Sequence, residues 1–207
     1  MTRQDSITQV TGPFNEDLEM IRNQLRRFIE AEVTAKAEPW EEEGKVPRDV
    51  LRRMGDLGVL GMRYDEQYGG AGLDVMSSVV LAEEVGRSTF GGFSATVLVH
   101  TDMASPHLEN AGTPEQKARW MPSIVSGEMI TAVAVTEPGA GSDVAGMRSR
   151  AVRDGSDWVL NRATQMGFGG PKCGRGAGWV GAWGWRSGGP KSGKSGKMVE
   201  KYIIYLD

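Results

Sequence analysis

The sequence predicts a mainly α-helical amino-terminal bundle followed by the first strands of a β domain. Apolar residues recur at helical spacing in five segments up to about residue 127. Capping residues, prolines and glycines stand at the ends of these segments. After residue 129 the helical period gives way to β-branched runs that end in corners rich in Gly and Pro.

Four of the five predicted helices have a terminal signal of their own, and the fourth in order is predicted from its richness in small residues. They cover residues 15–37, 47–57, 74–85, 92–104 and 113–124. Asn15 and Asp74 are suitable N-caps for the first and third helices. Pro47 stands in the first turn of the second helix, where its missing N–H costs nothing. Thr113 and Gln116 form a capping box that opens the fifth helix.

Two strand segments follow the helices. They are predicted over residues 130–135 and 148–160, and a turn at residues 154–156 divides the second segment into a hairpin. From Arg162 onward the periodicity vanishes, and only residues 202–206 can pair as a strand. The organised part of the sequence therefore ends near Asn161.

The composition changes at the same boundary. The whole chain of 207 residues has a net charge of −3, but residues 162–207 alone carry +6 and hold 12 of the 29 glycines.

No apolar run approaches the roughly 20 residues that span a bilayer, and the polar amino terminus lacks the core of a secretory signal. A lone Cys173 allows no internal disulfide and fits a reducing compartment. We therefore expect a cytoplasmic protein.

The basic tail contains one motif-like stretch. Residues Gly188 to Ser195 match the G-x-x-x-x-G-K-[ST] pattern of a phosphate-binding P-loop. A working P-loop needs a preceding strand and a following helix, and neither is predicted there. The tail also combines cations with tryptophans, as single-stranded nucleic-acid sites do. No recognised nucleic-acid module accompanies it, so we expect no nucleic-acid partner.

The loop at residues 136–143, Thr-Glu-Pro-Gly-Ala-Gly-Ser-Asp, directly follows the first strand. Its small residues let the backbone approach a flat or anionic ligand, and successive N–H groups can form an anion-binding concavity. Glu137 and Asp143 flank the corner. Carboxylates facing a phosphate would repel it, so we expect both acids to hold the loop in place.

This octapeptide resembles the flavin-binding loop of the acyl-CoA dehydrogenase family. Residues 14–127 are similar to that family's amino-terminal helical domain, including the turn that we expect to be flexible at Gly69 to Gly72. The resemblance covers residues 14–161. It implies a helical domain at 1–127, an incomplete β-barrel domain with the flavin loop at 128–161, and a non-native or disordered tail at 162–207. It also implies that the family's carboxy-terminal helical bundle is missing.

The resemblance implies a flavin-dependent oxidoreductase that performs α,β-dehydrogenation of an acyl-CoA thioester. FAD is the implied cofactor, an electron-transfer flavoprotein the implied acceptor, and a homo-oligomer the assembly usual in the family. The matching positions imply that Val133, Ala134, Val135 and Thr136 lie along the flavin ring, with Gly141 and Ser142 beside the cofactor. For the acyl-CoA, the implied contacts are Ser142 and the helix residues Ser94, Val97 and Leu98.

The sequence departs from the family after Asn161. The family has a Trp and a Thr against the flavin where this chain has Met166 and Phe168. Reading the codons one base later forces a Trp at the expected place, so we hypothesise a frameshift near Arg162. The family's carboxylate base comes from the later helical bundle, and no residue here matches it. We therefore assign no catalytic residue and expect the chain to be inactive alone.

Two less specific interpretations stay open. One is a non-catalytic, truncated helical module whose basic tail associates with anionic partners. The other, more remote, is a nucleotide binder acting through Gly188 to Ser195. Flavin absorbance, salt-sensitive polyanion binding and ATP turnover would separate the three functions.

The remaining polar residues predict ordinary structure. His100 and His107 have no Cys or acidic partner at a metal-ligand spacing, so we expect two satisfied or exposed histidines and no metal. The Glu83–Glu84 pair and the run 41–43 are expected on the solvated surface. The Arg26–Arg27 pair is expected to be ordinary helix-face charge.

Overall fold

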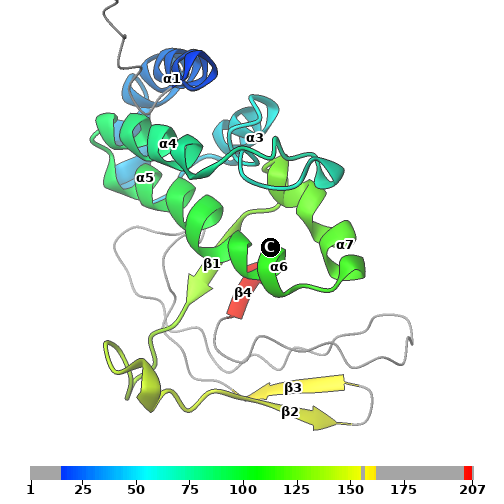
Figure 1. The fold of residues 1–207 in the computed structure, drawn as a ribbon. Helices are drawn as coiled ribbons and strands as arrows, with labels where there is room; N and C mark the ends of the chain where they lie inside the picture. Colours follow the sequence, from blue (N-terminus) through cyan, green and yellow to red (C-terminus); the bar gives the residue numbers. More distant parts are fainter. Residues whose placement is uncertain (1–14, 155–156, 162–202, 207) are drawn as a thin grey trace, which may run out of the picture.

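The computed structural model describes residues 15–154, 157–161 and 203–206. Figure 1 shows a helical body from which strand β1 leads down to a separate β hairpin. The α-helices are α1 (Glu16–Phe28), α2 (Ala37–Glu43), α3 (Arg48–Asp56), α4 (Val75–Arg87), α5 (Gly91–Leu98), α6 (Ser105–Ala111) and α7 (Pro114–Val125). Two π-helical segments, η1 (Ile29–Thr34) and η3 (Val99–Ala104), and two 3₁₀ turns, η2 (Glu66–Tyr68) and η4 (Val144–Gly146), complete the helical elements.

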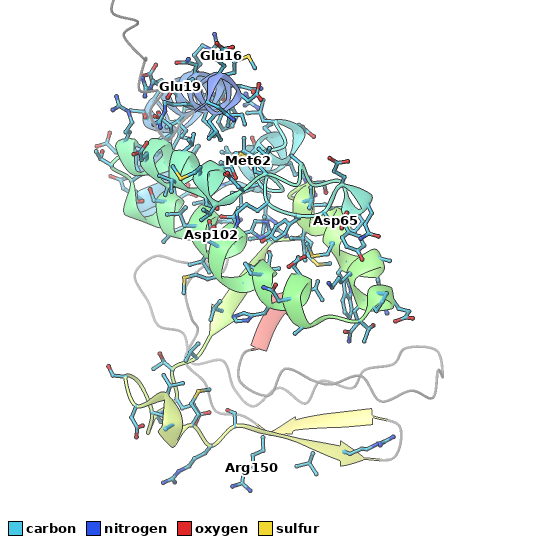
Figure 2. The ribbon with its side chains drawn as sticks, in the orientation of Figure 1. Glu16, Glu19, Met62, Asp65, Asp102 and Arg150 are labelled. Carbon is cyan, nitrogen blue, oxygen red and sulfur yellow. The ribbon has the colours of Figure 1, made fainter. Side chains whose placement is uncertain are left out.

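The first helix begins where its sequence predicts. The Asn15 side chain accepts a hydrogen bond from the backbone N–H of Leu18 at 2.9 Å, which satisfies one otherwise unpaired amide of the first turn. Glu16 and Glu19 lie on the outer side of α1, whereas Met62 lies inside the helical body (Figure 2). The apolar face of α1 therefore packs inward.

The predicted helix over 15–37 is not one continuous α-helix. It passes into the π-helical η1, which keeps Ile29 and Val33 buried, and a separate helix, α2, follows from Ala37. Helical spacing alone did not reveal α2, because its sequence is dominated by glutamates. Gly44 ends α2 with φ +67°, a left-handed conformation that glycine adopts without strain.

Two of the three other terminal signals are confirmed, and the third is off by one residue. Pro47 is the N-cap directly before α3 and does not stand in its first turn, whereas the Asp74 side chain accepts the Met76 N–H at 2.9 Å at the start of α4. At α7, Thr113 and Gln116 form both hydrogen bonds of the capping box. Local chemistry therefore decided where these helices begin.

The turn at Gly69 to Gly72 is present, but its backbone is held rather than loose. Ala71 N–H donates to the Gly61 carbonyl at 3.1 Å and Gly72 N–H to the Tyr64 carbonyl at 2.9 Å. A Cβ on Gly70 would stand 2.0 Å from the Tyr64 carbonyl oxygen. This close approach of two backbone segments requires glycine at position 70.

The main core lies between α1, α3, α4 and α5. Its fully enclosed residues include Leu25, Met54, Leu60, Leu81 and Phe93. A second cluster gathers Tyr64, Leu108, Met121, Ile124 and Val125 where α6 and α7 meet. These clusters bury the apolar stripes that helical periodicity predicted.

One expectation about the surface is wrong. Glu84 is 1% exposed and pairs with Arg26 and Arg22 of α1, and with Arg87 of its own helix. Glu84 was expected on the solvated surface, and Arg26 was expected to carry ordinary helix-face charge. Charge composition could not reveal that α1 crosses α4 at this point, so the correction comes from tertiary packing.

The fourth predicted helix is also divided. It comprises α5 and the π-helical η3, after which α6 begins at Ser105 with Pro106 in its first turn. Strand β1 (Thr131–Ala134) packs against η3. This contact joins the helical body to the β part of the chain.

The described strands form two separate pairs. β2 (Arg150–Asp154) and β3 (Asp157–Asn161) form an antiparallel hairpin in which Arg150 faces Asn161. β1 pairs antiparallel with β4 (Ile203–Leu206), with Thr131 opposite Leu206. The described residues therefore show a mainly helical fold with the beginning of a β domain, as the sequence predicted.

Candidate functional site

The small-residue loop at 136–143 begins two residues after the end of β1. Glu137 and Ala140 exchange backbone hydrogen bonds, at 2.8 Å for the Glu137 N–H and 3.2 Å for the Ala140 N–H, and so close a tight turn. A Cβ placed on Gly139 or Gly141 would meet no heavy atom within 4 Å. The loop therefore presents open backbone on the surface.

The two acids of the loop hold its ends. The Glu137 carboxylate, 9% exposed, accepts the N–H groups of Arg148 at 2.7 Å and Ser149 at 2.9 Å, and the Ser149 hydroxyl as well. Asp143 accepts the Gly146 N–H at 3.2 Å and caps η4. The expectation that both acids hold the loop in place is confirmed, and the Glu137 carboxylate is turned toward these N–H groups.

The predicted cofactor residues differ in their burial. Val133 is buried and Val135 half-buried, whereas Thr136, Gly141 and Ser142 are exposed. The side chain of Ala134 lies outside the description. Among the described residues, no hydrogen-bond partner is found for the N–H of Gly141 or Ser142. Exposed donors beside side chains this small fit a flat or anionic group.

The predicted acyl-contact residues lie on α5, one helical turn apart. Val97 is fully buried in the main core, and Ser94 and Leu98 are half-buried. The Ser94 hydroxyl donates to the Val85 carbonyl at 2.9 Å. Because α5 continues into η3, which contacts β1, this helix is mechanically joined to the strand that carries the loop.

A buried polar cluster at this junction was not singled out from the sequence. His100 is 1% exposed, and its Nδ1 lies 2.9 Å from the Thr131 Oγ1 and 3.1 Å from the Thr131 N. Its Nε2 lies 3.1 Å from the Ile124 carbonyl oxygen. The Ser105 hydroxyl bonds the Thr131 hydroxyl at 2.7 Å. Thr131, a hydroxyl residue at the start of an apolar strand, was the available signal, but its partner is 31 residues away.

Burial lowers the pKa of His100 to about 4, with the Ile124 carbonyl acting in the opposite direction. His100 is therefore a neutral core histidine whose hydrogen bonds are satisfied. Of the two expectations stated for it, satisfied or exposed, the first is confirmed. In the part of the chain that the structure describes, no three His, Cys, Asp or Glu side chains gather as metal ligands.

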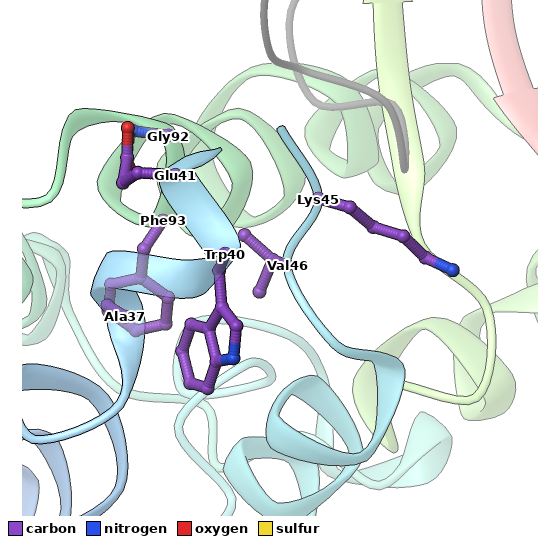
Figure 3. Close-up of a pocket in the computed structure, with 7 residues that line it drawn as sticks. All are labelled: Ala37, Trp40, Glu41, Lys45, Val46, Gly92 and Phe93. Carbon is purple, nitrogen blue, oxygen red and sulfur yellow. Dashed lines mark hydrogen bonds between the residues drawn. The ribbon is translucent and has the colours of Figure 1, made fainter. Parts of the chain in front are cut away.

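Other surface features are minor. A pocket beside α2 and the start of α5 is lined by Trp40, Lys45, Val46 and Phe93, and its cavity of about 10 Å³ suits a single water (Figure 3). Glu41 at its rim accepts the Gly92 N–H at 2.9 Å. Thus Glu41, expected simply on the solvated surface, also caps α5.

Within the described ranges, no helix is long and apolar enough to cross a membrane.

Several predictions concern residues outside the described ranges. They are the P-loop match at Gly188 to Ser195, the substitutions at Met166 and Phe168, and the tail at 162–207 apart from β4. These stay predictions.

The fold and site define a class of protein. It has a helical amino-terminal domain that passes through a short strand into an acid-held loop of small residues, open to a flat or anionic ligand. The family model for "Acyl-CoA dehydrogenase, N-terminal domain" matches residues 15–128. The chain belongs to the acyl-CoA dehydrogenase family.

Individual relatives agree with this assignment. Over 150 residues the chain is 41% identical to the mitochondrial long-chain specific acyl-CoA dehydrogenase of Rattus norvegicus, covering 72% of this chain and 34% of the relative. It is 36% identical to the (2S)-methylsuccinyl-CoA dehydrogenase of Cereibacter sphaeroides, covering 71% of this chain and 27% of that protein. The chain thus spans about a third of the length of these curated relatives.

Solved structures show the same fold. An acyl-CoA dehydrogenase of Geobacillus kaustophilus superposes with a TM-score of 0.68 at 38% identity, over 73% of this chain and 40% of that one. A glutaryl-CoA dehydrogenase of Mycobacterium smegmatis in complex with FADH2 superposes with a TM-score of 0.68 at 34% identity, over 73% of this chain and 39% of that one. A chain from a structure of the electron transferring flavoprotein of Acidaminococcus fermentans superposes with a TM-score of 0.68 at 28% identity, over 73% of this chain and 40% of that one.

Proposed function

We propose that this chain supplies the amino-terminal part of a flavin-dependent acyl-CoA dehydrogenase, with FAD bound along residues 133–136 and at the loop of 136–142. The observation that carries the proposal is the open loop itself. It has exposed N–H donors at Gly141 and Ser142, small side chains around them, and both flanking carboxylates engaged in holding the backbone.

The chemistry of the described residues supports a flavin at this loop. The Thr136 side chain is exposed two residues after the end of β1 and can hydrogen-bond a polar edge of a flat ring. The open backbone at Gly141 and the Ser142 hydroxyl can meet phosphate oxygens. When bound, FAD would supply the hydride acceptor for oxidation of the acyl-CoA at its α,β bond.

The chain's own contribution would be binding and orientation. Ser94 and Leu98 would border the acyl chain, with Val97 packing behind them in the core, and Ser142 would lie near both cofactor and thioester. We propose the division into 1–127, 128–161 and 162–207 as the corresponding domains. An electron-transfer flavoprotein is the proposed acceptor, a homo-oligomer the proposed assembly and the cytoplasm the proposed compartment.

We further propose that the general base is not among the described residues. A base must reach the α-proton with an available carboxylate. The buried carboxylates of the described part are Glu84 and Glu137, and both are already engaged, by arginines and by backbone N–H groups. On the described residues alone, we therefore expect flavin to be held without being reduced.

The test is an FAD titration of the full chain, with two Gly→Ala variants. A Cβ at Gly141 or at Gly86 meets nothing within 4 Å, so neither substitution strains the protein. We expect Gly141→Ala to weaken FAD binding at least about 5-fold, because the methyl group keeps the ligand from the backbone, whereas Gly86→Ala leaves binding unchanged.

Adding palmitoyl-CoA or butyryl-CoA to the loaded chain completes the test. We expect the flavin absorbance to persist. A chain that retains no FAD would overturn the flavin proposal, and salt-sensitive heparin binding without FAD would support a non-catalytic, anion-associating module instead. Bleaching of the flavin would show that the base is present after all.

A further inference from the structure

We infer that His100 is a positioning residue for the flavin-binding segment: its bonds to Thr131 fix β1 against η3 and so set where the chain enters the loop of residues 136–143 that is offered to the cofactor. The inference deepens the proposed function and rests on it for the identity of the ligand. The placement of β1 stands independently of that ligand.

The tautomer of His100 follows from its partners. The Ile124 carbonyl can only accept, so Nε2 carries the proton. In a neutral imidazole this leaves Nδ1 as an acceptor, and the Thr131 N–H donates to it at 3.1 Å. A strand amide that would otherwise need a ladder partner is therefore bonded by a helix side chain.

The π-helical segment η3 brings His100 to this place. β1 packs against η3, and Val99 and Ala104 of η3 form a small cluster with Val133 of β1. The Thr131 hydroxyl is held by the Ser105 hydroxyl at 2.7 Å. Thr131 is thus fixed from both ends of the segment. π-helical turns are often found at functional sites, which agrees with this role.

The short strand β1 carries the effect of this anchor to the loop. Side chains two residues apart share a face of a strand, so once Thr131 faces η3, Val133 faces it too. Thr131 and Val133 are buried there, Ala132 between them is buried as well, and Val135, just past the strand, is half-buried against the same cluster. Thr136, the first residue of the loop, is exposed. By fixing Thr131 against η3, His100 therefore sets the position at which the chain enters the loop.

Two isosteric substitutions separate the two bonds of the ring. His100→Asn keeps an acceptor near the position of Nδ1 and loses the donor to Ile124. His100→Gln keeps a donor near the position of Nε2 and loses the acceptor for Thr131. Both remove a buried ring, so both should lower the melting temperature to a similar degree. Only the Gln variant should release β1.

The first readout needs no ligand. Amide hydrogen exchange across residues 130–149 of the full chain should accelerate at least about 10-fold in His100→Gln relative to His100→Asn. The second readout is FAD affinity, which should weaken about 10-fold in His100→Gln and clearly less in His100→Asn. His107→Gln is the control. His107, the other histidine of the chain, is half-buried on α6, and its replacement should alter neither readout.

The outcomes are distinct. Equal exchange rates in the two His100 variants would overturn the inference, whether or not FAD binds. A difference in exchange without FAD binding by the parent chain would leave His100 as the anchor of β1 and remove the proposed flavin function. If His100→Gln does not fold, ¹⁵N spectra of the parent imidazole decide: a proton on Nδ1 at neutral pH contradicts the inference, and a proton on Nε2 supports it.

Discussion

Arg26 donates two hydrogen bonds to Glu84, from Nε to Oε2 at 3.0 Å and from Nη2 to Oε1 at 2.7 Å. This paired contact joins α1 to α4, and Arg22 adds a third bond to Glu84 at 3.3 Å. The hydrogen bonds from Arg26 hold the pKa of Glu84 below its ordinary range. The helical body is therefore held by a charge cluster as well as by its apolar core.

We predict that Glu84→Gln destabilises the protein by about 2–3 kcal/mol. Gln keeps the volume of Glu84, but it removes the charge that compensates the arginines and turns an amide N–H toward a guanidinium donor. Urea unfolding at neutral pH measures the loss. Glu83→Gln, the adjacent and half-exposed residue that pairs with Arg22, should cost less than about 1 kcal/mol. Similar losses from both changes would refute a special role for Glu84.

Acid should destabilise the fold through His100. The pKa of this ring is about 4 in the folded protein against an ordinary 6.5, so between these values the unfolded chain binds a proton that the folded chain does not. The free energy of unfolding should therefore be nearly constant well above pH 6.5, begin to fall as the pH approaches 6.5, and fall most steeply between the two pKa values. The loss grows to roughly 3 kcal/mol when the transition is complete.

Urea titrations between pH 7 and 5 test this slope, because carboxylates such as Glu84 stay charged in both states over that range. His100→Asn has no titrating ring at this position, so its slope over the same range should be nearly flat. A parent slope that persists unchanged in the variant would assign the acid sensitivity to another group.

Two Gly→Ala changes, one in α3 and one in α4, should change the stability of the protein in opposite directions. A Cβ on Gly55 of α3 would stand 2.0 Å from the backbone carbonyl oxygen of Ser126, at the end of α7, so Gly55→Ala should cost at least about 2 kcal/mol. Gly86 is exposed on α4 with open space around it, and Gly86→Ala should stabilise by up to about 1 kcal/mol through helix propensity. Thermal melts of both variants measure the pair, and a stabilising Gly55→Ala would contradict the close approach of α3 to α7.

The loop should depend on the charge of Glu137. Glu137→Gln replaces an oxygen that accepts backbone N–H groups with an amide that donates, so residues 148–149 lose a partner and the loop loosens. We expect FAD affinity to fall about 10-fold and limited proteolysis at the loop to accelerate. Asp143→Asn is the matched control, because Asn caps the following turn nearly as well as Asp. An equal effect of the two changes would show that net charge, rather than the Glu137 contacts, governs binding.

Much of the fold was predictable because its signals are local. Asn15, Asp74 and Thr113 cap the helices that they were expected to cap, and the hairpin of β2 and β3 follows the expected division of the 148–160 segment. The role of the two loop acids was also predictable, since it follows from the repulsion between like charges. In contrast, α2 and the two π-helical segments were not expected, because they depend on what the neighbouring elements bury.

The sequence by itself determined that a helical part precedes the first strands, where the capped helices α1, α4 and α7 begin, and the loop of small residues, since each depends on contacts within a few residues. Only the tertiary structure decided that Glu84 is buried among arginines and that His100 reaches across to Thr131. These pairs lie 58 and 31 residues apart. Which polar groups meet over such separations depends on how helices cross and how strands dock, and that geometry is a property of the packed core as a whole.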